Sequence, residues 1–335
     1  MRKFEVHKNT EKIEPTKEQI NRQKDFARLH HQYEQLTKRG KKPLYRNPKL
    51  LLFWIVIAII LFLAFYLYPA LQNLQFATRR WDGITEPEFV GLGNFKNLLT
   101  NDDLFYKTLG NNLEFTFIVV LFQTAFALLF AIYLVNNSKT NIALRTLYFF
   151  PTILSSVSVG MIWLFLYDPN FGALNLFFNK VGLNAFALNW LGSESSALYA
   201  IAFTQVWFHT GQMMVVYIAG LQQIPKELYE AAEVDGASRW KQFTKVTWPM
   251  AMPTTIVVMA YTTIQSFRAF DLIMVMTNST AGPNNSTSIF STLVYFTLFN
   301  ELRLGYSAAQ TIFMVITMVL ITWLQRKGLG KRYER

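Results

Sequence analysis

Residues 225–249 read PKELYEAAEVDGASRWKQFTKVTWP, a charged stretch between two segments apolar enough to cross a lipid bilayer. Pro225 suits the start of a helix, and residues 226–234 are mostly good helix formers. Gly236 is expected to end or bend that helix, because glycine adopts backbone angles that other residues avoid. The sequence therefore predicts a charged helix that lies outside the apolar segments.

A second amphipathic stretch covers residues 237–248, and Pro249 is expected to stop it just before the next apolar segment. The first helix offers a small apolar face at Leu228, Ala231 and Ala232. Small side chains let another protein approach closely, whereas a helix that rests on lipid headgroups carries bulky Leu, Phe and Trp. We interpret the segment as a docking helix, with an interfacial helix as the alternative.

The composition is that of a membrane protein. Of the 335 residues, 52% are hydrophobic and 16% are charged, against about 25% charged in soluble domains. There is no cysteine, which excludes disulfides and thiolate metal sites. The net charge is +11, of which residues 1–50 contribute +8. This uneven charge is not that of a nucleic-acid-binding protein.

Six segments are long and apolar enough to span a bilayer core, which needs about 20 residues in a helix. Spanning segments are expected to be helical because unpaired backbone groups cannot face lipid. The six are 50–71, 113–135, 144–166, 198–221, 253–276 and 306–324.

Lysine and arginine counts predict the orientation of these segments. If the N-terminus is cytoplasmic, the inside segments hold 25 basic residues and the outside segments hold 6. Because basic residues concentrate on the cytoplasmic side, both termini are predicted to be cytoplasmic.

The predicted organisation is a basic cytoplasmic tail at 1–49, a six-helix domain at 50–326 with its loop at 222–250, and a short basic tail at 327–335. Within the first tail, Thr16 and Gln19 have capping-box spacing. Phe26, Leu29, Tyr33 and Leu36 recur on one face of a predicted surface helix.

Glu230-Ala231-Ala232, three residues, Gly236, nine residues and then Val246-Thr247-Trp248-Pro249 resemble the EAA loop of binding-protein-dependent ABC importer permeases. The family pattern is Glu-Ala-Ala-x3-Gly-x9-Ile-x-Leu-Pro, so Val246 and Trp248 depart from it but keep apolar character. In that family the loop is a coupling helix seated in a groove of the cytoplasmic ATPase. The resemblance assigns ATPase coupling to Glu230, Ala231, Ala232, Asp235, Gly236 and Pro249.

Further stretches resemble the sugar-permease branch, and most closely the maltose-type, first-position permease of an oligosaccharide importer. They are 89–99, 144–175, 218–225, 267–277 and 281–283. The resemblance covers about 50–330 and implies the type I ABC importer permease fold, an all-α polytopic membrane protein.

The resemblance also implies the partners. They are a second homologous permease subunit in a heterodimer, two ATPase subunits that use ATP and Mg, an extracytoplasmic solute-binding protein, a carbohydrate substrate and the lipid bilayer. The location implied is a bacterial plasma (inner) membrane. No nucleic acid is expected as a partner.

Polar residues inside spans are costly and tend to face the bundle interior or a water-filled path. Gln205, His209 and Gln212 follow four- and three-residue steps and so share one helix face. Amides and hydroxyls mixed with aromatic rings suit a sugar. The predicted substrate pathway is Thr152, Gln205, Trp207, His209, Gln212, Thr262, Gln265 and Ser266.

The alternative for these residues is hydrogen bonding between helices, which uses the same residue types. Arg268 and Asp271 are three residues apart and are expected to pair on one helix, as structural or gate groups.

The sequence contains no GxxxxGK[ST] phosphate loop, no metal-ligand cluster and no Ser/His/Asp arrangement. We therefore expect a transport subunit that is not an enzyme and binds no cofactor itself. Two alternatives stay open: an importer of a glycerol phosphodiester or sugar phosphate, or an ion-coupled secondary carrier, for which Asp271 is the candidate intramembrane carboxylate.

Overall fold

A computed structural model describes residues 17–38 and 48–330. The chain divides into two units, the first extending to Ala70 and the second beginning at Leu71. In the first, α1 (Lys17–Lys38) confirms a helix in the basic tail. Phe26, Leu29 and Tyr33 are exposed on it, whereas Thr16 and the side chain of Leu36 lie outside the described parts of the chain.

The first unit also contains α2 (Pro48–Phe62), the π turn η2 (Leu63–Leu67) and the start of α3 (Tyr68–Ala77). This continuous apolar helix covers the predicted segment 50–71.

The second unit is a helical bundle built around α9 (Ala197–Leu221). Helix α5 (Asp103–Leu134) packs along α9, and α12 (Trp248–Phe267) packs on both. Met213, Met214 and Tyr217 of α9 share one buried cluster with Ala127 and Ala131 of α5. Helix α15 (Leu304–Gly330) packs on the outer side of α12.

Two predicted spans are broken helices. Segment 144–166 is α6 (Lys139–Phe149), the 3-10 turn η3 (Phe150–Ile153) and α7 (Ser156–Leu166), with a bend of 97°. Pro151 lies in the turn, and a proline removes a helix hydrogen bond and crowds the preceding turn. Segment 253–276 is α12 and α13 (Phe270–Met276), bent by 46°.

Within the described residues, three helices are long and apolar enough to cross a membrane, or up to five if each bent pair is one span. Helix α9 matches the predicted segment 198–221 but is not among them, because its polar side chains lower its hydropathy. Gln205 is 2% exposed on this buried helix.

Helix α12 runs through Pro249, so the expected stop at that proline is wrong. The preceding π turn η5 (Phe243–Thr247) explains why: the Trp248 N–H donates to the Phe243 carbonyl, five residues back. This wider turn ends directly before the residue that has no N–H, so the helix continues. The same arrangement occurs in the first unit, where Tyr68 donates to Leu63 just before Pro69.

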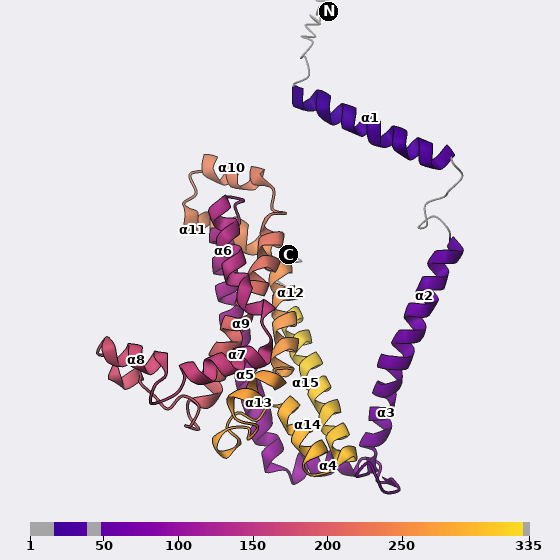
Figure 1. Cartoon of the computed structure of the whole chain (residues 1–335), viewed down its shortest axis with the longest axis vertical. Coiled ribbons are helices and arrows are strands. Elements are labelled where there is room, and N and C mark those ends of the chain that lie inside the picture. The colour runs from indigo at the N-terminus through magenta and orange to yellow at the C-terminus, as the bar shows by residue number, and fades with distance from the viewer. Residues whose placement is uncertain (1–16, 39–47, 331–335) are drawn as a thin grey trace, which may run out of the picture. The chain divides into compact units, whose positions relative to one another are not determined.

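The two ends of the bundle differ. At one end, which we call the α10 end, lie α10 (Lys226–Val234) and α11 (Arg239–Gln242) (Figure 1). At the opposite end, the α4 end, lie α4 (Gly93–Thr100) and α14 (Phe290–Phe299).

A two-stranded antiparallel ribbon, β1 (Arg79–Arg80) and β2 (Glu88–Phe89), precedes α4. Helix α8 (Ala173–Lys180) and the turn η4 (Asn184–Phe186) stand to one side of the bundle (Figure 1). The turn η6 (Pro283–Asn285) lies in the loop before α14.

Candidate functional site

Helix α10 projects at its end of the bundle with most of its surface free. Glu230, Ala231, Asp235 and Gly236 are exposed, and Ala232 is half-buried. Tyr229 fixes the helix to the bundle, because its hydroxyl lies 3.0 Å from the Thr247 hydroxyl of η5. The structure thus presents five of the six predicted coupling residues together. Pro249 lies apart from them, within α12.

Gly236 closes α10 in the left-handed backbone region, with φ +69°. Its N–H donates to the Glu233 carbonyl at 3.0 Å, and the Ala237 N–H donates to the Ala232 carbonyl at 2.9 Å. These bonds satisfy helix-end carbonyls, which is the usual role of a C-terminal glycine. Ser238 then caps α11 by accepting from the Lys241 N–H. The helix–turn–helix predicted from the sequence is confirmed.

A polar pocket of about 260 Å³ lies between α7, α9, α12 and α13. Three of the predicted pathway residues line it: Gln205, His209 and Gln265. Tyr261 also lines it, and its hydroxyl accepts a hydrogen bond from Gln212 at 3.2 Å. The pocket therefore gathers amides, an imidazole and a phenol, which donate and accept hydrogen bonds at several angles.

One cation and one carboxylate also face this pocket. Arg268 lies at the break between α12 and α13, and Asp271 lies in the first turn of α13. The expected Arg268–Asp271 pair does not form, because Arg268 has left the helix and the three-residue spacing is no longer helical. Asp271 instead accepts a hydrogen bond from the Ser156 hydroxyl at 2.9 Å.

Other predicted pathway residues form contacts between or within helices. The Thr152 hydroxyl donates to the Phe208 carbonyl at 3.0 Å, and the Ser266 hydroxyl donates to the Thr262 carbonyl at 2.8 Å. Thr262 is fully buried. Its hydroxyl accepts from Gln123 at 3.4 Å. These three hydroxyls therefore join the backbone and side chains of the bundle, and none lines the polar pocket.

Trp207 lies on another face of α9. Its ring packs edge-on against Trp163 at 5.4 Å, and it lines a separate apolar pocket of about 420 Å³ with Phe126 and Phe130. The predicted pathway included Trp207 with its neighbours along the chain, although successive helix residues point in different directions.

Tyr261 and Gln123 were missed by the sequence analysis. Tyr261 lies four residues before Gln265, the spacing of one helix face, so it could have been found. Gln123 lies on α5 and donates to both Thr262 and Gln265. It could not have been placed there without knowing how α5 packs on α12.

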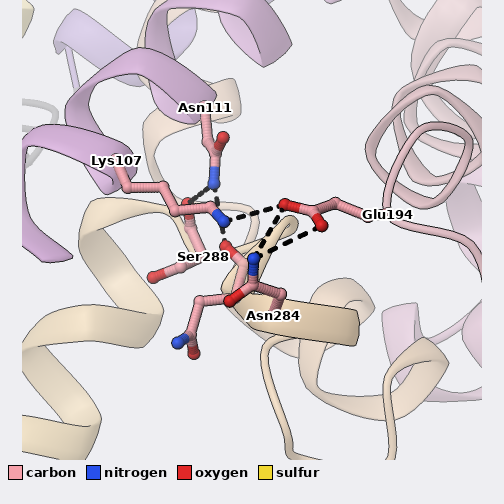
Figure 2. Close-up of polar contacts among 6 residues, drawn as sticks. Lys107, Asn111, Glu194, Asn284 and Ser288 are labelled. Atoms are coloured by element: carbon pink, nitrogen blue, oxygen red, sulfur yellow. Dashed lines mark hydrogen bonds and ion pairs between the residues drawn. The ribbon is translucent and has the colours of Figure 1, made fainter.

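At the α4 end, a polar cluster joins three segments (Figure 2). Glu194, in the loop before α9, accepts from Lys107 of α5 at 2.9 Å and from Asn284 at 3.1 and 3.3 Å. Asn111 donates to the carbonyls of Asn285 and Ser288, at 3.0 and 3.2 Å. The loop before α14 is thereby held to α5 and to the start of α9.

The family model "Binding-protein-dependent transport system inner membrane component" matches residues 123–327. This range contains α10, Gly236 and all the helices around the polar pocket. The chain belongs to this family. The resemblance found from the EAA loop is therefore confirmed, and the chain is a permease of a binding-protein-dependent ABC importer.

Two curated relatives are similar over most of the permease. The trehalose/maltose transport system permease protein MalF of Thermococcus litoralis is 32% identical over 278 residues, covering 83% of this chain and 91% of the relative. The sn-glycerol-3-phosphate transport system permease protein UgpA of Agrobacterium fabrum is 30% identical over 291 residues, covering 85% and 97%.

The permease also shares its fold with a solved structure, a bacterial ABC transporter involved in the import of the acidic polysaccharide alginate. The TM-score is 0.71 at 22% identity, covering 90% of this chain and 99% of that chain. The helical architecture is thus that of an ABC importer permease.

Proposed function

We propose that this permease forms half of the membrane pathway of an ABC importer for a carbohydrate, most simply an oligosaccharide. The observation that carries the proposal is the polar pocket between α7, α9, α12 and α13, in a member of this transporter family. The relative named for trehalose and maltose transport supports a sugar as the substrate.

The chemistry of the pocket favours a neutral, hydroxylated ligand. A sugar needs a donor or acceptor for each hydroxyl. Gln205 and His209 of α9 and Tyr261 and Gln265 of α12 supply such groups. Trp207, Thr152, Thr262 and Ser266 support the pathway through packing. Gln212 supports it by holding the Tyr261 hydroxyl.

A phosphorylated solute is the second candidate, and two observations favour it: Arg268 lines the pocket, and one relative is named for glycerol 3-phosphate transport. Asp271 opposes it, because a carboxylate beside the only cation lining this pocket offsets the positive charge that a phosphate group requires. An ion-coupled carrier is not supported by the pocket, where Asp271 is bonded to Ser156 and not to a second titratable group.

Coupling to the energy source is assigned to α10. An ATPase subunit can receive Glu230, Ala231, Ala232, Asp235 and Gly236 at the end of the bundle. Pro249 lies in the first turn of α12, the helix that carries the motion inward. Two ATPase subunits, a second permease and a solute-binding protein complete the transporter. ATP and Mg are used by the ATPases, and this chain holds no cofactor and is not an enzyme.

The membrane arrangement follows from the same proposal. Six spans are obtained when α9 is counted with the three continuous helices and the two bent pairs. The α10 end faces the cytoplasm with both termini, in a bacterial plasma membrane, and the α4 end faces outward.

The test is ATP hydrolysis in reconstituted vesicles. The permease is co-expressed with the subunits encoded beside it, and binding proteins loaded with different sugars are added. Stimulation by one loaded binding protein, lost in Gly236→Ala, supports the proposal and identifies the sugar. Uptake that follows a proton gradient without a co-purifying ATPase would contradict it, and stimulation by a glycerol phosphodiester alone would select the second candidate.

A further inference from the structure

A second polar pocket, of about 920 Å³, lies at the α10 end of the bundle. It forms where the C-terminal ends of α5 and α9 meet α10, α11 and η5. The pocket is distinct from the polar pocket near Gln205 and shares no residue with it.

The charges that line this pocket are positive. Lys226, at the start of α10, and Arg239, at the start of α11, both line it, and no carboxylate does. Neither cation forms an ion pair within the described parts of the chain. The acidic side chains of α10, Glu227, Glu230 and Glu233, are exposed and do not line the pocket.

The neutral groups of the pocket also suit an anion. Asn136, Asn137 and Gln242 line it with side-chain amides that each carry two N–H donors. The Gln222 amide also lines it, but its nitrogen donates to the Val135 carbonyl and to Asn137 Oδ1. The Gln242 amide reaches only the Ala237 carbonyl, at 3.3 Å. A phosphate group accepts hydrogen bonds through several oxygens and binds both arginine and lysine well.

The helix ends at this pocket would ordinarily repel an anion, because the last carbonyls of a helix carry partial negative charge. At the end of α5 they accept hydrogen bonds from side chains. Arg145 donates to the Leu134 carbonyl at 2.5 and 2.8 Å and to the Asn136 carbonyl at 2.9 Å. Gln222 donates to the Val135 carbonyl at 3.2 Å. The electrostatic obstacle to an anion is thereby reduced at the end of α5.

We propose that this pocket is a binding site for a phosphate-type anion, either a free phosphate ester or the headgroup of an anionic lipid. An anion held between Lys226 and Arg239 would tie α10 and α11 to the ends of α5 and α9. If α10 couples transport to ATP hydrolysis, as proposed above, a bound anion would restrain the movement of α10 relative to the bundle. The binding itself does not depend on the coupling role.

The test uses the full-length chain, with the subunits that purify with it, in phosphatidylcholine nanodiscs. Inorganic phosphate is titrated at constant ionic strength, with chloride as the matched salt, and the thermal unfolding midpoint is followed. A ligand that binds only the folded state raises this midpoint. A second set of nanodiscs contains phosphatidylglycerol, which distinguishes a lipid headgroup from a free phosphate.

The lining variant is Lys226→Gln with Arg239→Gln. Its matched control is Lys241→Gln with Lys245→Gln, which removes the same charge from the same segment outside the pocket. Both lining cations are exposed, so folding is preserved. We expect the apparent affinity for phosphate to fall about tenfold or more in the lining variant and to change less than about twofold in the control.

A midpoint raised by phosphatidylglycerol but not by phosphate, and lost only in the lining variant, supports the site with a lipid as its ligand. No rise with either probe overturns the proposal. An equal rise in the lining and control variants also overturns it, since general charge screening would explain that result. None of these outcomes measures transport or ATP hydrolysis, so their failure is distinguishable from failure of the proposed function.

Discussion

Lys107 Nζ lies 2.9 Å from Glu194 Oε1, which joins the first turns of α5 to the loop before α9. Asn284 donates to both oxygens of the same carboxylate from the loop before α14. That loop contains several residues with positive φ, among them Ala281 at 58° and Asn285 at 55°. Such backbone conformations persist only where the surroundings hold them, and Glu194 is one of the groups that do so.

The first prediction concerns the pH dependence of this cluster. The hydrogen bond from Lys107, with a second from Asn284, lowers the pKa of Glu194 below its ordinary value of 4.5. A lowered carboxyl pKa contributes stability above the ordinary value, and this contribution is lost as pH falls through the folded-state pKa. We expect the protection of residues 277–289 against hydrogen exchange, measured relative to the intrinsic rate at each pH, to fall below about pH 4.5. Glu194→Gln should show the lower protection already at neutral pH.

The control for this measurement is Glu86→Gln, an exposed carboxylate at the same end of the bundle. Its exchange profile should match the unaltered permease at every pH. If Glu194→Gln behaves like Glu86→Gln, the cluster does not hold the loop.

The second prediction separates backbone strain from coupling. Gly236 has φ +69° and Gly182 has φ +78°, and a Cβ at either would meet no atom within 4 Å. Alanine should therefore cost about 1–2 kcal/mol at both positions, from the left-handed backbone alone. We expect only Gly236→Ala to reduce transport per ATP hydrolysed, because Gly182 follows α8, away from α10. Equal loss of transport in both variants would show that stability, and not α10, limits the reaction.

The third prediction concerns a close approach between two backbone segments of the bundle. A Cβ at Gly211 of α9 would lie 2.0 Å from the Tyr148 carbonyl oxygen. Since backbone cannot yield as a flexible side chain does, Gly211→Ala should destabilise the permease by about 1–3 kcal/mol or more. Gly110→Ala is the control, since Gly110 is helical and has open space around it; it should be neutral or stabilising by about 0.5–1 kcal/mol. Gly211→Ala should lower the thermal unfolding midpoint clearly, whereas Gly110→Ala should leave it unchanged or raise it.

The helices were largely predictable from the sequence, whereas their breaks were not. Pro151 lies in a 97° bend and Pro249 lies in a continuous helix, although both follow aromatic residues in apolar surroundings. The difference depends on how the carbonyls before each proline are satisfied. Before Pro249, the π turn η5 satisfies the Phe243 carbonyl with the Trp248 N–H. Whether such a turn forms depends on how the segment packs against the rest of the bundle.

The predicted pathway residues fall into two groups, hydroxyls that form bonds within the bundle and amides that line the polar pocket. The sequence could have separated these groups in part. Short hydroxyl side chains in helices bond the carbonyl four residues back, as Ser266 does with Thr262. Amides are longer and reach beyond their own helix, and Gln205 and Gln265 line the pocket. Helical spacing alone cannot distinguish these behaviours, but the length of the side chain can.

The last prediction compares a residue that lines the polar pocket with one that is buried in the bundle. Tyr261 lines the polar pocket, and Tyr261→Phe removes only its hydroxyl, which accepts from Gln212. A lost hydrogen bond of about 0.5–1.5 kcal/mol corresponds to a roughly two- to tenfold change in an equilibrium constant. We expect the sugar concentration for half-maximal uptake to rise by that factor, with little change in the unfolding midpoint. Thr262→Val should do the reverse, because Thr262 is fully buried and accepts from Gln123: the midpoint falls while half-maximal uptake is unchanged. If Thr262→Val shifts the uptake curve and Tyr261→Phe does not, the substrate passes along a different face of α12.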